Sequence, residues 1–349
     1  MKYFQIIPLI LFSIALCPNS SFTQTAPDSA ASYAFANPGA YKVDTAEYTW
    51  HDVARDRDVP VKIYYPENIT APCPVIVFSH GLGGSREGYS YLGEYWAGHG
   101  YISVHPTHKG SDTDILKHTL RPLKALREAA DDPANLINRP KDISFVIDKL
   151  FELNKNDKLF KGKFNLDEIG VAGHSFGGYT SLASGGMTLI TPDGKDFTLM
   201  DKRIKAGIAM SPPAKKKDTA TLKKIYGSIK IPFFVMTGTK DQLPFANYSS
   251  MKNSALGTIA EDRRIPFDNM NGPDDYLIVF NGADHMTFSG RLMNTKKTER
   301  NDKEFQKYIT MSSTAFWDAY LKGDVKAKQW LAGGGFKQTL GNVGTFEVK

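Results

Sequence analysis

Short apolar runs alternate along this chain with longer segments of mixed polarity. The most apolar runs cover residues 74–79, 101–104, 169–172, 204–210, 232–237 and 276–280. Such runs are typical of strands that are buried on both faces of a parallel sheet. The segments between several of them are long enough to hold helices, and strands that alternate with helices predict an α/β fold. We therefore expect a doubly wound, mostly parallel sheet, whose last strand is the run over residues 276–280.

Three segments have the pattern of helices. Residues 142–153 carry apolar side chains at i, i+3, i+4 and i+7, and Pro140 is expected in the first turn of this helix. Residues 91–97 form a shorter predicted helix. Residues 305–321 are predicted as the C-terminal helix, with Gly323 as its cap.

Two strand-like runs precede the sheet core. Residues 48–53 and 59–65 flank a polar segment and predict an antiparallel hairpin that ends at Pro66. Because we find neither an internal repeat nor a linker after this point, residues 48–349 are predicted to form a single domain.

The N-terminus has the pattern of an export signal. Lys2 precedes an apolar run over residues 6–16 that is too short to span a bilayer. We predict a signal peptide over residues 1–26, with an undefined cleavage site, and a disordered lead-in over residues 27–47. The protein is then periplasmic or secreted. Cys17 could anchor a lipoprotein, but Leu16 is bulky where a lipoprotein box needs a small residue, so anchoring is the less favoured alternative.

Composition is ordinary for a globular protein, with 41% hydrophobic and 23% charged residues. The formal charge of +6 includes a lysine run at residues 215–217. Neither interleaved aromatic residues nor a nucleic-acid motif accompanies this run, so we expect no nucleic acid partner. A solvated face is favoured, and peripheral contact with an anionic membrane surface is the alternative. Cys73 is the one cysteine beyond the signal, so no disulfide is expected within the mature chain.

The most informative stretch is Gly-His-Ser-Phe-Gly at residues 173–177, between a strand run and a helix-competent segment. This order is that of a nucleophile elbow, a turn so sharp that positions two before and two after the serine must lack a Cβ. Gly173 and Gly177 meet this requirement, and the following helix N-terminus favours negative charge. Ser175 is therefore predicted as a nucleophile, the alternative being a glycine-rich turn that happens to contain serine.

A serine nucleophile needs a base, and the base needs an acid that orients it. In this fold they follow the serine in the order acid then histidine, each after a strand. Asp241 follows the run at residues 232–237, and His285 follows the run at residues 276–280. We predict Ser175, Asp241 and His285 as the catalytic triad, although either partner alone could be an ordinary loop residue.

An oxyanion needs two N–H donors, one of them from the residue after the nucleophile. That residue is Phe176, and the second donor is expected at Leu82, in the glycine-rich loop after residues 74–79. Gly81 lets the backbone approach the substrate there. His80 and His174 are predicted to make structural hydrogen bonds within their turns.

A metal site is the weaker interpretation of His105, His108 and Asp112, because a third ligand in a recognisable register is missing. We expect these residues to shape a loop by hydrogen bonding, and we predict no metal and no cofactor.

The sequences Phe-Ser-His-Gly-Leu-Gly at residues 78–83, Gly-His-Ser-Phe-Gly-Gly at residues 173–178 and Tyr-Tyr-Pro at residues 64–66 resemble the platelet-activating-factor acetylhydrolases. They are also similar to the bacterial predicted dienelactone hydrolases. The resemblance implies an α/β-hydrolase fold, ester hydrolysis through an acyl-serine, no metal, and Leu82 and Phe176 as oxyanion donors.

Two departures from these families bear on the assignment. The plasma acetylhydrolase takes its acid from the loop after the strand that follows the elbow helix, whereas that loop here reads Ser-Pro-Pro at residues 211–213 and has no carboxylate before Asp218. The acid is therefore assigned to Asp241. Dienelactone hydrolases use a cysteine nucleophile, and this chain has Ser175.

The sequence thus predicts an exported serine carboxylic-ester hydrolase for short acyl esters, with small-molecule and lipid esters as candidate substrates. A polyester, cutinase-like or lactone hydrolase on the same triad, a peptidase or thioesterase, and a non-catalytic binding protein are the alternatives. Residues 242–275 form a long and partly apolar connection, and we expect them to contribute a helix that packs over the site.

Overall fold

The computed structural model describes residues 39–117, 119–243, 246–251, 254–290 and 299–349, and within them a sheet of nine strands forms the centre. The strands are Val43–Asp52 (β1), Arg57–Pro66 (β2), Cys73–Ser79 (β3), Ile102–Pro106 (β4), Phe164–His174 (β5), Ile204–Met210 (β8), Phe233–Lys240 (β9), Asp275–Asp284 (β10) and Gly344–Val348 (β11). Their order is β1-β2-β4-β3-β5-β8-β9-β10-β11. Along this order each strand from β4 to β10 is parallel to the next, whereas the pairs β1–β2, β2–β4 and β10–β11 are antiparallel. The predicted α/β fold, with an antiparallel N-terminal hairpin, is confirmed.

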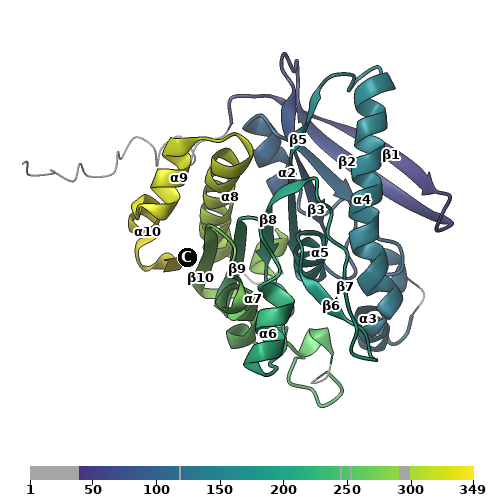
Figure 1. The fold of residues 1–349 in the computed structure, drawn as a ribbon, viewed down its shortest axis with the longest axis vertical. Coiled ribbons are helices and arrows are strands. Elements are labelled where there is room, and N and C mark those ends of the chain that lie inside the picture. Colours follow the sequence, from purple (N-terminus) through teal and green to yellow (C-terminus); the bar gives the residue numbers. More distant parts are fainter. Residues whose placement is uncertain (1–38, 118, 244–245, 252–253, 291–298) are drawn as a thin grey trace, which may run out of the picture.

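Helices cover both faces of this sheet (Figure 1). They are Ser90–Gly98 (α2), Pro122–Asp131 (α3), Pro133–Asn156 (α4), Phe176–Ser184 (α5), Thr219–Tyr226 (α6), Ile265–Asn269 (α7), Glu299–Leu321 (α8), Val325–Ala332 (α9) and Gly335–Leu340 (α10). Side chains alternate along each strand. Ile76 and Phe78 of β3 therefore pack in the cluster under α2 and α8, and Val75 and Val77 pack in the cluster under α4.

The N-terminal hairpin is longer than expected. Strand β1 begins at Val43, before the expected start at Tyr48, because it pairs with β2 along its whole length, from Val43 opposite Pro66 to Asp52 opposite Arg57. The end of the predicted lead-in is thus strand. The predicted signal peptide, Cys17 and the lead-in up to residue 38 lie outside the described residues.

Helix α4 starts earlier than its apolar pattern predicts. Asp132 caps it by accepting a hydrogen bond from the N–H of Ala134 at 2.8 Å, so Pro140 lies inside the helix and its predicted place in the first turn is wrong. A proline at this position leaves the carbonyl of Leu136 without its helical donor. The hydroxyl of Tyr179 donates to that carbonyl at 3.2 Å.

The C-terminal part of the fold continues beyond the predicted last elements. After α8 the chain forms α9 and α10 and then adds β11 beside β10, so the prediction that residues 276–280 are the last strand is wrong. Strand β11 is short and partly exposed, and its pattern is therefore not that of a buried strand.

Residues 242–275 do not form the single covering helix that was expected. Their described part contains the 3-10 turns Ala255–Gly257 (η2) and Ala260–Arg264 (η3) and the short helix α7. They nevertheless cover part of the sheet edge, because Met251 and Leu256 pack against Ala130 of α3, with Leu243 beside them. Every helix in the described part of the chain is too short or too polar to cross a bilayer.

A stability measurement tests the docking of β11. Phe346 is 4% exposed and packs edge-on against Phe336 at 4.8 Å, whereas Val348 of the same strand is 39% exposed. Phe346→Ala should lower the free energy of unfolding by about 3–5 kcal/mol, because a buried aromatic ring leaves a cavity. Val348→Ala, the matched control, should cost much less. Equal losses in denaturant titrations would contradict the docked strand.

Candidate active site

Ser175 occupies a strained turn between β5 and α5. Its backbone has φ 56° and ψ −118°, and its N–H donates to the carbonyl of Met210 at 2.9 Å. A Cβ on Gly177 would collide with the carbonyl oxygen of Ser79, and a Cβ on Gly173 would collide with the backbone of Gly177. Both glycines are therefore sterically required, and the partly exposed serine is fixed at the carboxyl end of the sheet.

The structure brings the three predicted triad residues into one hydrogen-bonded line. Asp241 directly follows β9 and His285 directly follows β10, at the same edge of the sheet as Ser175. His285 Nδ1 lies 2.8 Å from Asp241 Oδ1, and His285 Nε2 lies 2.9 Å from Ser175 Oγ. A carboxylate can only accept, so Nδ1 carries the proton and Nε2 accepts from the serine hydroxyl.

The carboxylate of Asp241 is buried and surrounded by donors. His285 and the Arg263 Nε, at 2.8 Å, contact Oδ1, while the hydroxyls of Thr237, at 2.8 Å, and Ser211 donate to Oδ2. Burial alone would raise the pKa of Asp241, but the Arg263 charge and these hydrogen bonds hold that pKa below its ordinary value. Asp241 is therefore ionised and oriented.

The loop after β8 supplies a hydroxyl group to the site and no carboxylate. Ser211, the first residue of the Ser-Pro-Pro segment, donates its hydroxyl to Asp241. Asp218 lies further along and caps α6 by accepting from the N–H of Thr221 at 2.9 Å. Of the two candidate acids, only Asp241 reaches His285.

A second buried group, Arg263 of η3, was not predicted from the sequence. Its guanidinium donates to the backbone carbonyls of Asp241 and Ser211, each at 2.7 Å, and so joins the loops after β8 and β9. Burial lowers the pKa of His285, the nearby Arg263 charge lowers it further, and Asp241 opposes both effects. Arg263 thus both holds the two loops in place and lowers the pKa of His285.

His174 connects the elbow to the base. Its Nε2 lies 2.9 Å from the carbonyl of His285, which can only accept, so this nitrogen carries the proton. Its Nδ1 then accepts from the Tyr89 hydroxyl at 2.8 Å, and that oxygen accepts from the N–H of Gly81 at 3.2 Å. Burial holds the pKa of His174 well below its ordinary value, so the ring is neutral.

The glycine-rich loop after β3 presents backbone groups beside the serine. The N–H of Gly83 donates to Ser111 at 2.9 Å and that of Gly84 to Gly81 at 3.0 Å, while no acceptor within the described residues contacts the N–H of Leu82. Phe176 is the first residue of α5, so its N–H has no acceptor within the helix. Leu82 and Phe176, the two predicted oxyanion donors, line one small space together with Ser175.

Buried Arg139 of α4 holds this side of the site. It donates to the carbonyl of His80, to Ser111 Oγ at 2.8 Å and to Thr180 Oγ1 at 2.9 Å, and its guanidinium lies 4.6 Å from the centre of the Phe176 ring. His80 in turn accepts from the N–H of His108 at 3.0 Å through Nε2. Arginine side chains are mostly exposed in folded proteins, so the sequence does not indicate that Arg139 and Arg263 are buried.

His105 and His108, which were considered as metal ligands, both have hydrogen-bond partners in the protein. His108 Nδ1 lies 2.9 Å from Asp142, and His105 Nε2 lies 2.9 Å from Ser103 Oγ. Asp112 caps the turn Thr113–Leu116 (η1) by accepting from Asp114. Among the described residues, no group of three or more potential metal ligands is found.

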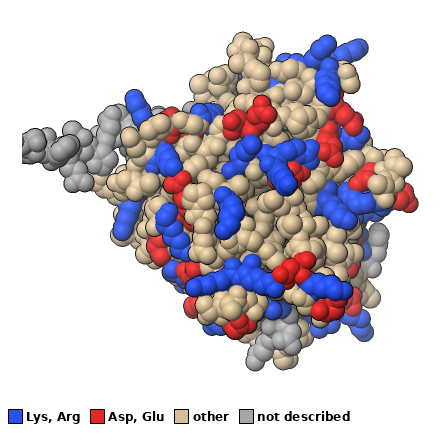
Figure 2. Space-filling view, in the orientation of Figure 1, with Lys and Arg blue, Asp and Glu red and all other residues tan. Residues whose placement is uncertain are grey.

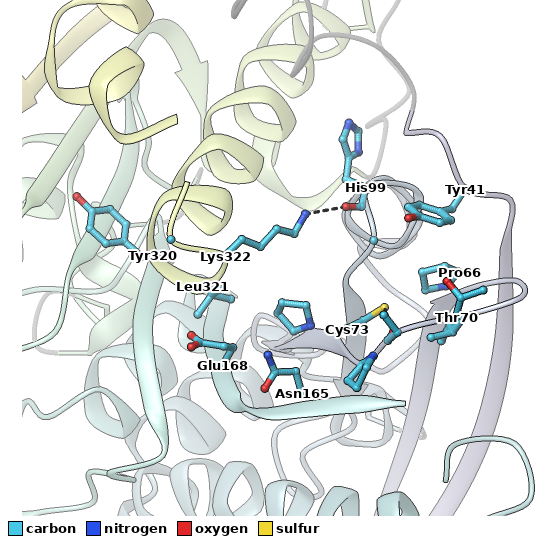
Figure 3. A pocket seen from close by; sticks show the side chains of 16 residues that line it. Tyr41, Pro66, Thr70, Cys73, His99, Asn165, Glu168, Tyr320, Leu321 and Lys322 are labelled. Atoms are coloured by element: carbon cyan, nitrogen blue, oxygen red, sulfur yellow. Dashed lines mark hydrogen bonds between the residues drawn. The ribbon is translucent and has the colours of Figure 1, made fainter. Parts of the chain in front are cut away.

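A cavity of about 600 Å³ lies away from the triad (Figure 3). It opens beside Cys73 at the start of β3 and Asn165 near the start of β5. These strand ends are opposite to the carboxyl ends, where Ser175 lies. Lys322 lines it and donates to the carbonyl of His99 at 2.9 Å, as Figure 3 shows. Burial raises the pKa of the Cys73 thiol, which makes it a weak nucleophile. The triad does not line this cavity, so it lies outside the candidate active site.

The lysine run lies on a surface of mixed charge. Lys216 lies 3.3 Å from Asp262, and Lys224, further along, lies 2.7 Å from Asp196. Figure 2 shows basic side chains beside acidic ones across the face that it draws. This arrangement agrees with a solvated face.

Comparisons with known proteins agree with this fold. The family model for platelet-activating factor acetylhydrolase, isoform II, matches residues 53–128, which include Leu82 but not the triad. Platelet-activating factor acetylhydrolase of Canis lupus familiaris is 28% identical over 207 residues, covering 51% of this chain and 43% of that protein. The protein of the same name from Bos taurus is 26% identical over 297 residues, covering 74% of this chain and 59% of that protein.

The strand order and the resemblance indicate the α/β-hydrolase fold. Among proteins with this fold the chain is similar to the platelet-activating factor acetylhydrolases, and the resemblance seen in the sequence is confirmed. The matches span about two fifths to three fifths of the length of these two relatives.

The pH dependence of activity tests the role of Arg263. The base must be neutral to accept a proton, so activity should rise with pH through the pKa of His285. Arg263→Met removes a charge that lowers this pKa, so the acid limb of the kcat/KM profile should move to higher pH, whereas Arg263→Lys should move it less. If both variants lose kcat with an unmoved acid limb, Arg263 has only a structural role.

Proposed function

We propose that this protein is a serine carboxylic-ester hydrolase that acts through an acyl-serine intermediate. The observation that carries the proposal is the continuous contact from Asp241 through His285 to Ser175. Each residue follows a different parallel strand, which is how the fold assembles a nucleophile, a base and an orienting acid at one sheet edge.

The geometry supports a two-step reaction. Ser175 Oγ attacks the ester carbonyl while His285 Nε2 takes its proton, and the Oγ–C bond forms as the carbonyl oxygen becomes an oxyanion. The N–H groups of Leu82 and Phe176 are proposed to stabilise this oxyanion. The imidazolium of His285, stabilised by Asp241, then protonates the departing alcohol. Water attacks the acyl-serine in the second step, with the same proton transfers.

Short acyl esters are the proposed substrates. The two mammalian relatives are named for the hydrolysis of an acetyl group. A cavity of about 220 Å³ touches Ser175 and His285, and Leu116, Leu126 and Leu256 line it. Its size and apolar lining favour a small group on one side of the ester bond, and small-molecule and lipid esters are both candidates.

Export is part of the proposal. Its support is the sequence pattern of Lys2 followed by the apolar run over residues 6–16. N-terminal sequencing of the protein recovered outside the cytoplasm tests it, because a retained residue 1 would contradict cleavage.

Removal of the nucleophile tests the proposed function. Ser175→Ala should lower kcat for an acetyl ester by about four to six orders of magnitude, because the triad acts as a unit. The side chain is small and partly exposed, so circular dichroism and the melting temperature should remain close to those of the wild type. A folded variant that keeps a tenth or so of the activity would show that Ser175 is not the nucleophile.

A further inference from the structure

A separate apolar cavity lies beyond the oxyanion residue Phe176. It has a volume of about 530 Å³, within the usual range for ligand pockets, whereas the cavity beside His285 has about 220 Å³. The strands Thr188–Ile190 (β6) and Asp196–Thr198 (β7) form a small hairpin, and β6 walls one side of the cavity while α6 walls another. The lining is mostly apolar, and Tyr179, Leu189, Ile225 and Tyr226 contribute to it, while Lys215 and Lys217 also line the cavity.

A small space lies between this cavity and the nucleophile. This space has a volume of about 20 Å³ and is lined by Ser175, His285 and Phe176. Phe176, Pro213 and Ala255 line both this space and the larger cavity. Two of these three side chains are small, and Ala255 belongs to the three-residue turn η2. Binding of an acyl chain in the cavity requires a small displacement of that turn, which would join the two spaces.

The position of His285 decides which part of an ester lies on each side. The leaving oxygen must lie within reach of His285 Nε2, because that nitrogen delivers its proton. His285, Met286 and Ser289 line the 220 Å³ cavity, whereas none of them lines the cavity beyond Phe176. The alcohol therefore lies on the smaller side, and the acyl substituent points away from it across the carbonyl carbon.

We propose that the cavity beyond Phe176 binds the acyl chain, and that the substrates include esters of apolar, medium-length fatty acids with small alcohols. This inference rests on the proposed function and extends it from acetyl groups to longer acyl chains. Each methylene that leaves water for an apolar wall strengthens binding by about fourfold. A cavity with this lining therefore favours longer chains until it is full.

The test alters each cavity separately and measures kcat/KM for two ester series. One series carries acetyl to decanoyl groups on nitrophenol, and the other carries acetate on alcohols of increasing size. Leu189→Trp fills the cavity beyond Phe176 and should lower the octanoyl-to-acetyl ratio by about tenfold or more. Leu189→Ala should move the preference toward longer acyl chains.

Two further variants distinguish the alcohol side of the site from the acyl side. Leu116→Trp narrows the cavity beside His285 and should discriminate against the larger alcohols. Thr198→Trp is the control on the hairpin, since Thr198 is exposed on β7 and does not line the cavity, and it should leave the acyl series unchanged.

Several results would overturn the inference while the proposed function stands. They are wild-type hydrolysis of acetyl but not octanoyl esters, an acyl ratio unchanged by both Leu189 variants, and an acyl ratio that responds to Leu116→Trp instead. Absence of acetyl ester hydrolysis by the wild type would contradict the proposed function itself.

Discussion

The buried carboxylate of Asp241 is the constraint on which the rest of the site depends. An unpaired charge in a protein interior costs several kcal/mol, so its donors must all be in place. They come from four parts of the chain, namely Thr237 in β9, Ser211 after β8, His285 after β10 and Arg263 in η3. The same set of contacts that neutralises the charge therefore fixes three strand ends and the long connection between β9 and β10.

The opposite side of the site is constrained in a similar way. The closeness of Gly177 to Ser79 sets the spacing between α5 and β3, and Arg139 joins the loop after β3 to α5 through His80 and Thr180. Two buried arginines thus flank the nucleophile, one fixing the acid and one fixing the oxyanion loop. Such rigid surroundings keep the proposed donors and proton acceptor in place before the substrate binds.

The sequence predicts well whatever depends on local spacing. The elbow at residues 173–177 and the strand runs followed by Asp241 and His285 place three residues that the structure brings into contact. It fails where contacts between distant segments determine the structure. Pro140 is tolerated inside α4 because the Tyr179 hydroxyl donates to the carbonyl that the proline leaves without a donor. Edge strand β11 was missed because its residues do not have the pattern of a buried strand. The burial of Arg139 and Arg263 is missed for the same reason, since only the folded chain shows that a charged residue is buried.

We propose that the acid of the triad follows β9 and not β8. Comparing Asp241→Asn with Asp218→Asn tests it most directly, with kcat for an acetyl ester as the readout and circular dichroism as the check on folding. Asp241→Asn should lower kcat by roughly 10⁴, because an amide presents the wrong tautomer of His285 to the serine. Asp218→Asn should change kcat little, since Asp218 only caps α6. A large loss with Asp218→Asn and a small one with Asp241→Asn would contradict the account.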